Sequence, residues 1–237
     1  MGGDTDMSGT LYGVGVGPGD PELMTFRAWR IIAAADVVAF IGADGRPSRA
    51  RATAQAAIRA TSELLAIDMP MRADPKAGQA AYDSAAEQIA ACLRAGRNTA
   101  FLCEGDPLLY GSFIYLMARL QADFPVEVVP GLPSFVACAA ELRQPLARRS
   151  ESFGIVPGTL SDAELRNRLS ALDSAAIIKA GRHAGRIGRV LADLGLLGRA
   201  MVVEEVTTDR QTIRPFAADQ DVLPYFATII IPAGDAA

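Results

Sequence analysis

The chain has 237 residues, half of them apolar and 21% charged, a balance that excludes a disordered protein. The formal net charge of −4 gives no electrostatic reason to expect a nucleic-acid partner. The longest apolar runs, such as residues 225–232, are too short to span a bilayer, and the polar, acidic residues 1–8 lack the basic region of a signal peptide. We therefore expect a cytosolic globular protein that contacts neither membrane nor nucleic acid.

Short runs of apolar and β-branched residues alternate with stretches of helical periodicity in the first part of the chain, which is typical of an α/β fold. The expected strands are residues 10–16, 36–41, 63–67, 98–103 and 126–129. The expected helices are residues 21–35, 47–60, 75–95, 107–121 and 134–142.

A linker is predicted at residues 142–150, which carry a proline and three arginines without a clear period. We accordingly expect two α/β domains, residues 1–143 and 144–237. The expected strands of the second domain are residues 152–156, 174–179, 200–206, 212–216 and 225–231, and its helices are 161–172, capped by Ser161 or Asp162, and 183–194. The last two strands are too closely spaced for a helical crossover, so we expect them to form an antiparallel hairpin.

Glycine- and proline-rich turns follow three strands of the first domain. In the middle turn, Gly105 allows a sharp bend, Asp106 falls where a helix N-cap would lie, and Pro107 suits the first helical position. Because carboxyl ends of parallel strands meet at one edge of a sheet, three such turns can converge on a single crevice. The turns could also be well-formed strand–helix connections that bind no ligand. The local sequence does not decide between these two interpretations.

The first glycine cluster does not fit a dinucleotide-binding motif. A G-x-G-x-x-G pattern begun at Gly13 would need glycine at Pro18, and one begun at Gly15 would need glycine at Asp20. Proline also lacks the N–H that a pyrophosphate would use. The sequence contains no G-x-x-x-x-G-K-[ST] either, which excludes the ordinary P-loop.

Few side chains suit nucleophilic or metal chemistry. His183 is the single histidine and no G-x-S-x-G elbow accompanies it, so we expect neither a hydrolase triad nor a histidine-rich metal site. Cys92, Cys103 and Cys138 are widely spaced, which predicts buried free thiols. A crevice of main-chain groups suits a reaction whose driving force lies in the cofactor, while the protein supplies position and electrostatics.

Taken together, the three turns resemble the motifs of the tetrapyrrole methylase family. The resemblance rests on G-V-G-P-G-D-P-E-L (15–23), E-G-D-P-x-x-Y-G-S (104–112) and V-P-G-x-x-S-F (129–135), and it extends to residues 203–207 and 226–232. It implies two α/β domains with a trough between them for S-adenosylmethionine, S-adenosylhomocysteine as a product, and a homodimer. We expect no metal site.

Within the family, Glu104, residues 110–113 and the segment 179–182 are most similar to members that methylate carbon 20 of precorrin-2 in cobalamin biosynthesis. Two enzymatic alternatives stay open: the same carbon of a cobalt-loaded ring, or another ring position. A binding protein without activity is a further alternative, against which the intact turn around Asp106 argues.

The resemblance also implies which residues contact the cofactor: Pro18, Gly105, Asp106, Leu109, Pro133, Ser134, Ala180, Val206 and Thr228. Pro133 departs from the family pattern, in which serine or threonine is common, so a hydroxyl contact is not expected there. For the many carboxylates of the ring we expect Arg46, Arg49 and Arg182, although solvated surface is the default for such arginines. Tyr110 is a further candidate for substrate binding, with simple packing as its alternative.

No catalytic residue follows from the sequence. Placement of the methyl donor in line with an electron-rich carbon supplies much of the rate, so a nucleophilic side chain is not required. A proton leaves the methylated carbon afterwards. The sequence does not choose among Tyr110, Glu104 and His183 as the group that accepts it, and water is a further candidate. For His183, a place at the start of a helix is favoured over the role of a base.

Overall fold

The computed structural model describes residues 8–42, 47–69, 75–217 and 219–234. The chain divides into two compact units, Met1–Pro133 and Ser134–Ala237. This division assigns residues 134–142 to the second unit, whereas the domain limits 1–143 and 144–237 remain a sequence-based prediction. Within the described ranges, no helix has both the length and the apolar character that crossing a bilayer requires.

The first unit is built on a five-stranded sheet of order β3-β2-β4-β1-β5, in which every pairing is parallel. Its strands are β1 (Leu11–Gly15), β2 (Val37–Gly42), β3 (Glu63–Asp68), β4 (Thr99–Cys103) and β5 (Val126–Val129). Its helices are α1 (Phe26–Ala34), α2 (Arg49–Ala54), α3 (Pro75–Arg94) and α4 (Phe113–Leu120), with short 3₁₀ helices at Pro21–Leu23 and Gln55–Ala57.

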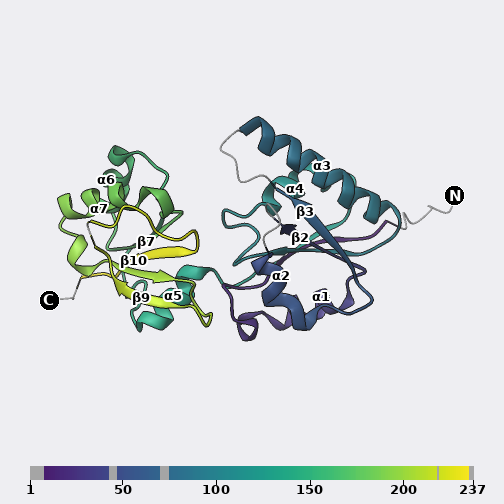
Figure 1. The fold of residues 1–237 in the computed structure, drawn as a ribbon, viewed down its shortest axis with the longest axis horizontal. Helices are drawn as coiled ribbons and strands as arrows, with labels where there is room; N and C mark the ends of the chain where they lie inside the picture. Colours follow the sequence, from purple (N-terminus) through teal and green to yellow (C-terminus); the bar gives the residue numbers. More distant parts are fainter. Residues whose placement is uncertain (1–7, 43–46, 70–74, 218, 235–237) are drawn as a thin grey trace. The chain divides into compact units, whose positions relative to one another are not determined.

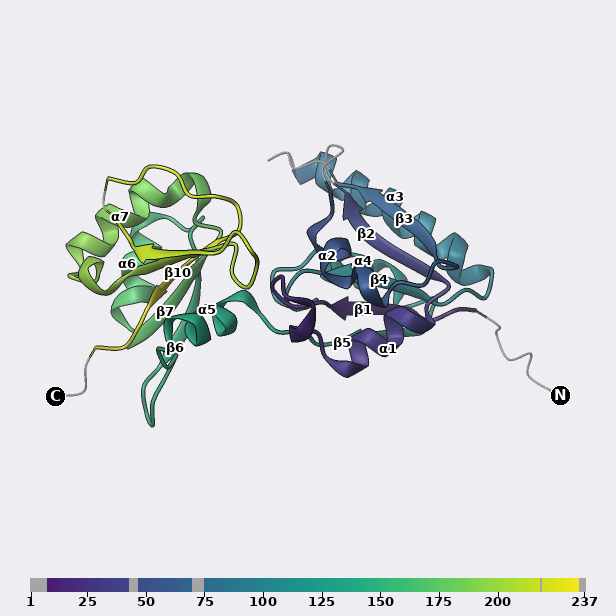
Figure 2. The ribbon, with the colours of Figure 1, turned by 60° about the horizontal axis from the view of Figure 1, so that its bottom comes forward.

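Helices cover both faces of this sheet (Figures 1 and 2). Along β4, Ala100 and Leu102 pack with α1 and α2, while Phe101 and Cys103 pack with α3 and α4. The chain leaves β1 towards β2 and leaves β4 towards β5, so the crossovers after these neighbouring strands run in opposite directions. The carboxyl ends of β1 and β4 therefore mark the topological switch point, where open α/β sheets bind ligands.

Two helices of this unit begin later than the sequence predicts. After Asp20 the chain makes one 3₁₀ turn, and α1 starts only beyond Thr25, whose hydroxyl accepts the Ala28 N–H at 3.1 Å. The expectation that Asp106 is the N-cap of a helix from 107 is wrong, because α4 begins at Phe113. Tyr110 has φ of 55°, and a residue in the left-handed region interrupts a right-handed helix.

The second unit contains a mixed sheet of order β6-β7-β10-β8-β9. Its strands are β6 (Phe153–Pro157), β7 (Ser174–Ile178), β8 (Met201–Glu204), β9 (Thr212–Pro215) and β10 (Ala227–Ile231). Its helices are α5 (Ser134–Leu142), α6 (Asp162–Ser170) and α7 (Ala184–Asp193), with 3₁₀ helices at Gly181–His183 and Leu197–Arg199. Helices α6 and α7 pack on one face, and α5 lies on the other against β10 (Figure 2).

The prediction that the last two strands pair with each other in a hairpin is wrong, although each of them is antiparallel to the strands beside it. β9 pairs with β8, and β10 inserts between β7 and β8. The reason is burial: all five residues of β10 are buried and apolar except Thr228, which suits a central strand. β9 is largely exposed and carries Arg214, which suits an edge.

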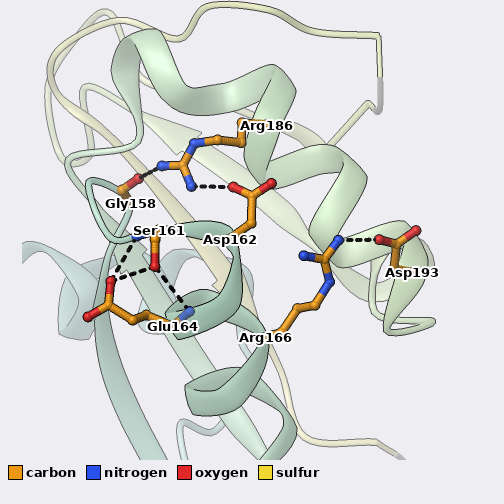
Figure 3. A network of polar contacts seen from close by, with 7 residues as sticks. All are labelled: Gly158, Ser161, Asp162, Glu164, Arg166, Arg186 and Asp193. Carbon is orange, nitrogen blue, oxygen red and sulfur yellow. Dashed lines mark hydrogen bonds and ion pairs between the residues drawn. The ribbon is translucent and has the colours of Figure 1, made fainter.

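Polar contacts fasten α6 to α7 (Figure 3). Ser161 caps α6 in a capping box with Glu164, which confirms the expected start. The Arg186 guanidinium donates to Asp162 Oδ1 and to the Gly158 carbonyl, both at 2.7 Å. The hydrogen bond from Arg186 is the main reason that the pKa of Asp162 lies below its ordinary value. Since Gly158 follows β6, the network also fixes the loop at the end of that strand.

Candidate functional site

The turns after β1 and β4 are joined by their main chains. The Gly105 N–H donates to the Gly17 carbonyl at 2.9 Å, and the Gly17 N–H donates back at 3.4 Å. Both residues have positive φ, 81° at Gly17 and 65° at Gly105, which glycine adopts without steric cost. The two glycine turns predicted from the sequence therefore form one short antiparallel bridge.

The turn after β5 joins the same cluster through Asp106. One oxygen of its carboxylate accepts the Leu108 N–H at 2.9 Å, and the other accepts the Gly131 N–H at 3.1 Å. Main chains also meet directly, because a Cβ at Gly15 would lie 2.6 Å from both the Gly105 oxygen and Gly131 Cα. The three turns thus converge as the sequence predicts, and Asp106 ties two of them together.

Helix α2 supports the first turn with two side chains. Arg49 Nη2 donates to the Pro18 carbonyl at 2.7 Å, and the Thr53 hydroxyl donates to the Gly19 carbonyl at 3.2 Å. The sequence suggested Arg49 as a ligand for substrate carboxylates, whereas the structure puts its guanidinium on the turn. Thr53 was missed, although its spacing of four residues from Arg49 places both on one helix face.

The loop after Asp106 is supported from α3 and α4. The Tyr82 hydroxyl donates to Ser112 Oγ at 3.1 Å, and the Tyr82 and Tyr115 rings stack with centroids 4.7 Å apart. Arg119 lies over the Tyr82 ring and pairs with an aspartate of α3. Tyr110 is 45% exposed within this loop. Sequence reasoning singled out Tyr110 and missed Tyr82, since nothing local marks a residue 30 positions from its partner.

Pro133 and Leu109 also lie in the cluster formed by the three turns, Pro133 by packing near Gly105 and Leu109 by a hydrogen bond to Asp106. The nearest atom to a Cβ built on Gly105 is Pro133 Cα at 3.7 Å, and the Leu109 N–H donates to the Asp106 carbonyl at 3.3 Å. Together with the buried Pro18, the first unit therefore collects five of the residues assigned to the cofactor.

The remaining four assigned residues gather at one edge of the second sheet. Strand register pairs Thr228 with Val203 and Ile229 with Ile177, so β10 begins where β7 and β8 end. Ala180 follows β7 and Val206 follows β8, and both are buried.

The Ser134 hydroxyl lies 3.4 Å from that of Thr228, which brings the start of α5 to this edge. Lys179 and Glu205 have φ of 55° and 49°, so left-handed turns directly precede Ala180 and Val206. A Cβ at Gly158 would lie 3.0 Å from Ala180 Cα, so the loop fixed by Arg186 packs closely on this residue.

The ionisable groups near these edges have distinct environments. Burial, followed by the charges of Arg186 and Arg182, lowers the pKa of His183, so its imidazole is neutral at neutral pH. Arg182 and Glu104 are exposed. Arg46, a predicted substrate ligand, lies outside the described residues.

The three cysteines are buried free thiols, as predicted. Burial is the main cause that raises the pKa of Cys138 to about 12 and that of Cys103 still further. Among the residues that the structure describes, no group of three histidine, cysteine or acidic side chains is arranged to hold a metal ion.

The fold and these contacts define a class of α/β protein in which main-chain turns converge at the switch point of a parallel sheet. Residues 10–220 match the sequence model of the tetrapyrrole (corrin/porphyrin) methylases. The chain belongs to this family, which confirms the resemblance inferred from its three turns.

Several relatives align along nearly the whole chain. A precorrin-2 C(20)-methyltransferase from Sinorhizobium sp. is 37% identical, with 94% of this chain and 95% of the relative covered. A cobalt-precorrin-2 C(20)-methyltransferase from Salmonella typhimurium is 33% identical, with 95% and 97% covered. The cobalamin biosynthesis protein CobIJ of Mycobacterium bovis is 40% identical over 95% of this chain, which spans 46% of that protein.

Solved structures share the fold. A cobalt precorrin-4 methyltransferase superposes with a TM-score of 0.74 at 20% identity, covering 98% of this chain and 97% of the other. A uroporphyrin-III C-methyltransferase from Thermus thermophilus, complexed with S-adenosylhomocysteine, has a TM-score of 0.69 at 24% identity, covering 94% and 92%. These likenesses confirm the predicted α/β fold class.

Proposed function

We propose that this protein transfers a methyl group from S-adenosylmethionine to carbon 20 of precorrin-2, giving precorrin-3A in cobalamin biosynthesis. The observation that carries the proposal is the 37% identity, along both full lengths, to a precorrin-2 C(20)-methyltransferase. The Salmonella relative favours one alternative, in which the ring already holds cobalt as part of the substrate.

The turn cluster suits a nucleoside cofactor. A Cβ on Gly105 would meet only Pro133 Cα and the Leu132 carbonyl within 4 Å, so the glycine leaves space beside the turn that any other residue would fill. Main-chain groups dominate there, and the Asp106 carboxylate adds negative charge that is compatible with a cationic sulfonium. When bound, S-adenosylmethionine supplies an electrophilic methyl group on sulfur.

The residues that would hold it are, in the first unit, Pro18, Gly105, Asp106, Leu109 and Pro133, and in the second unit, Ser134, Ala180, Val206 and Thr228. Those of the first unit would hold it through main-chain groups, which hydrogen bonds between the turns keep in place. The assignment in the second unit rests on the family resemblance and on the gathering of these four residues at one sheet edge.

For the substrate, exposed cationic and aromatic side chains are the candidates. Arg182 can bind a ring carboxylate through two parallel N–H donors, and Tyr110 offers a ring and a hydroxyl. Transfer of the methyl group would break its bond to sulfur, form a carbon–carbon bond at carbon 20 and leave S-adenosylhomocysteine. The proton of that carbon then leaves to an acceptor. His183 has the neutral imidazole that a proton acceptor needs, but Glu104, Tyr110 and water remain equal candidates.

The proposal is tested by incubating the protein with ¹³C-methyl-labelled S-adenosylmethionine and either metal-free precorrin-2 or its cobalt complex, and then locating the label by NMR. Label on carbon 20 of the metal-free ring is the expected result. Label on another carbon would refute the proposed position, and turnover of the cobalt complex alone would favour the alternative.

We also propose that the protein is a cytosolic homodimer, as the family resemblance implies. Sedimentation equilibrium is expected to give twice the chain mass of 24.9 kDa. A monomer at micromolar concentration would contradict this part of the proposal.

A further inference from the structure

Helix α2 contacts the turn after β1 through two consecutive carbonyls. Arg49 donates to the Pro18 carbonyl and Thr53 to the Gly19 carbonyl, at 2.7 and 3.2 Å. The two side chains lie four residues apart, which places them on the same face of the helix. One helix face therefore holds two adjacent peptide groups of a turn assigned to the cofactor.

Holding a carbonyl also fixes the direction of the following N–H. A trans peptide is planar, so its C=O and N–H point in opposite directions, and the described residues contain no cis peptide bond. With the Pro18 and Gly19 carbonyls turned towards α2, the N–H groups of Gly19 and Asp20 point away from that helix. The contacts thus determine the orientation of two main-chain donors in the turn.

Other contacts fix the residues on either side of the Pro18–Gly19 segment, while α2 holds the carbonyls of the segment itself. Gly17 is fixed by its reciprocal hydrogen bonds with Gly105, and the Asp20 carboxylate accepts the Glu22 N–H at 2.8 Å. Between these two fixed points lies the dipeptide whose carbonyls α2 holds. Thr53 is only 5% exposed, so its hydroxyl bond to Gly19 is sheltered from competing water.

We propose that Arg49 and Thr53 are positioning residues that orient the Pro18–Gly19 segment for the cofactor. The inference rests on the proposed function, because it takes this turn to bind S-adenosylmethionine. It replaces the expectation that Arg49 binds a substrate carboxylate. The Arg49 guanidinium donates to a carbonyl of the protein, and Thr53, which shares its helix face, has no charge to offer a carboxylate.

The test measures S-adenosylhomocysteine binding by isothermal titration calorimetry in Arg49→Met and Thr53→Val. Each substitution keeps the bulk of the side chain and removes its hydrogen-bond donors. We expect each to weaken binding by about tenfold, since loss of one hydrogen bond in a sheltered site has that order of effect. Arg49→Lys and Thr53→Ser keep a donor and are expected to bind at least threefold more tightly than Arg49→Met and Thr53→Val, respectively.

Arg59→Met is the matched control, because Arg59 also donates to two main-chain carbonyls, but these belong to Ala34 and Ala35 at the end of α1 and not to the turn. Its affinity is expected to equal that of the wild type. The calorimetric stoichiometry gives the folded fraction of every variant, so the measured Kd refers to folded protein even where a substitution lowers stability.

Steady-state kinetics separate the two roles of Arg49. A positioning role raises the KM for S-adenosylmethionine and leaves the KM for the tetrapyrrole within about twofold at saturating cofactor. Wild-type affinity for S-adenosylhomocysteine in either Arg49→Met or Thr53→Val overturns the inference. A raised KM for the tetrapyrrole alone in Arg49→Met also overturns it. If the wild type itself binds no S-adenosylhomocysteine, the proposed function fails and the inference fails with it.

Discussion

Replacement of Gly131 by alanine tests whether the three turns pack main chain against main chain. A Cβ on Gly131 would collide with the Gly105 carbonyl oxygen and lie 2.7 Å from Gly15 Cα, closer than carbon atoms approach without bonding. The φ of Gly131 is not in the left-handed region, so alanine is compatible with the backbone at this position. The substitution therefore probes contact between turns and not backbone strain.

The magnitude follows from what the new methyl group meets. Overpacking a filled region costs typically about 1–3 kcal/mol, and the lower values apply where a flexible side chain can move aside. Here both neighbours are main-chain atoms of other turns, which side-chain rotation cannot relieve. We expect Gly131→Ala to lower the free energy of unfolding of the first unit by about 3 kcal/mol.

Urea denaturation followed by tryptophan fluorescence measures this change, because Trp29 is the single tryptophan of the sequence and lies in α1 of the first unit. Gly78→Ala is the matched control: a Cβ on Gly78, in α3, meets nothing within 4 Å. That variant is expected to gain about 0.5–1 kcal/mol from the better helix propensity of alanine. Equal urea midpoints for Gly131→Ala and the wild type would refute the described packing.

Three further outcomes are expected. Ser161→Ala removes the N-cap of α6 and should lower stability in scanning calorimetry by about 1 kcal/mol; a loss below about 0.3 kcal/mol would contradict the capping box. Tyr82→Phe removes the hydrogen bond to Ser112 and should cost about 1 kcal/mol in the Trp29-monitored transition, whereas no change would contradict that bond. The folded-state pKa of Cys138, near 12, lies above the ordinary value of 9.0, so the stability of the wild type relative to Cys138→Ala is complete below pH 9 and falls above it. The slope should approach about 1.4 kcal/mol per pH unit, and a flat difference between pH 9.5 and 11 would refute this burial effect.

The strands, and the meeting of the three turns, could be predicted because their causes are local. Residues 99–103 are all buried and, apart from Thr99, apolar, as suits a parallel strand covered on both faces, and glycine and proline mark where such strands end. Convergence of the turns then follows from geometry alone, since parallel strands end at a common edge. The sequence thus predicts where the three turns meet before their contacts are known.

The contacts that hold the turns have no local cause and could not be predicted. Asp106 has the residue type and the position of an N-cap, yet its carboxylate binds Gly131, 25 residues away. Arg49 precedes no recognisable motif, and its contact with Pro18 spans 31 residues. Likewise, β10 leaves its expected hairpin because central burial, which depends on the whole sheet, outweighs proximity in sequence.

In the proposed site, where main-chain atoms form the binding surface, side chains have a different role. Asp106, Arg49 and Thr53 each direct a polar atom to the backbone of the turns, so each affects the position of a peptide group. Gly15 and Gly131 act by the absence of a side chain, which lets the turns touch. It follows that substitution of a glycine should reduce stability and cofactor affinity together. Substitution of Arg49, which is half-buried, should reduce affinity with little loss of stability, because the rest of the turn remains fixed through Gly17 and Gly105.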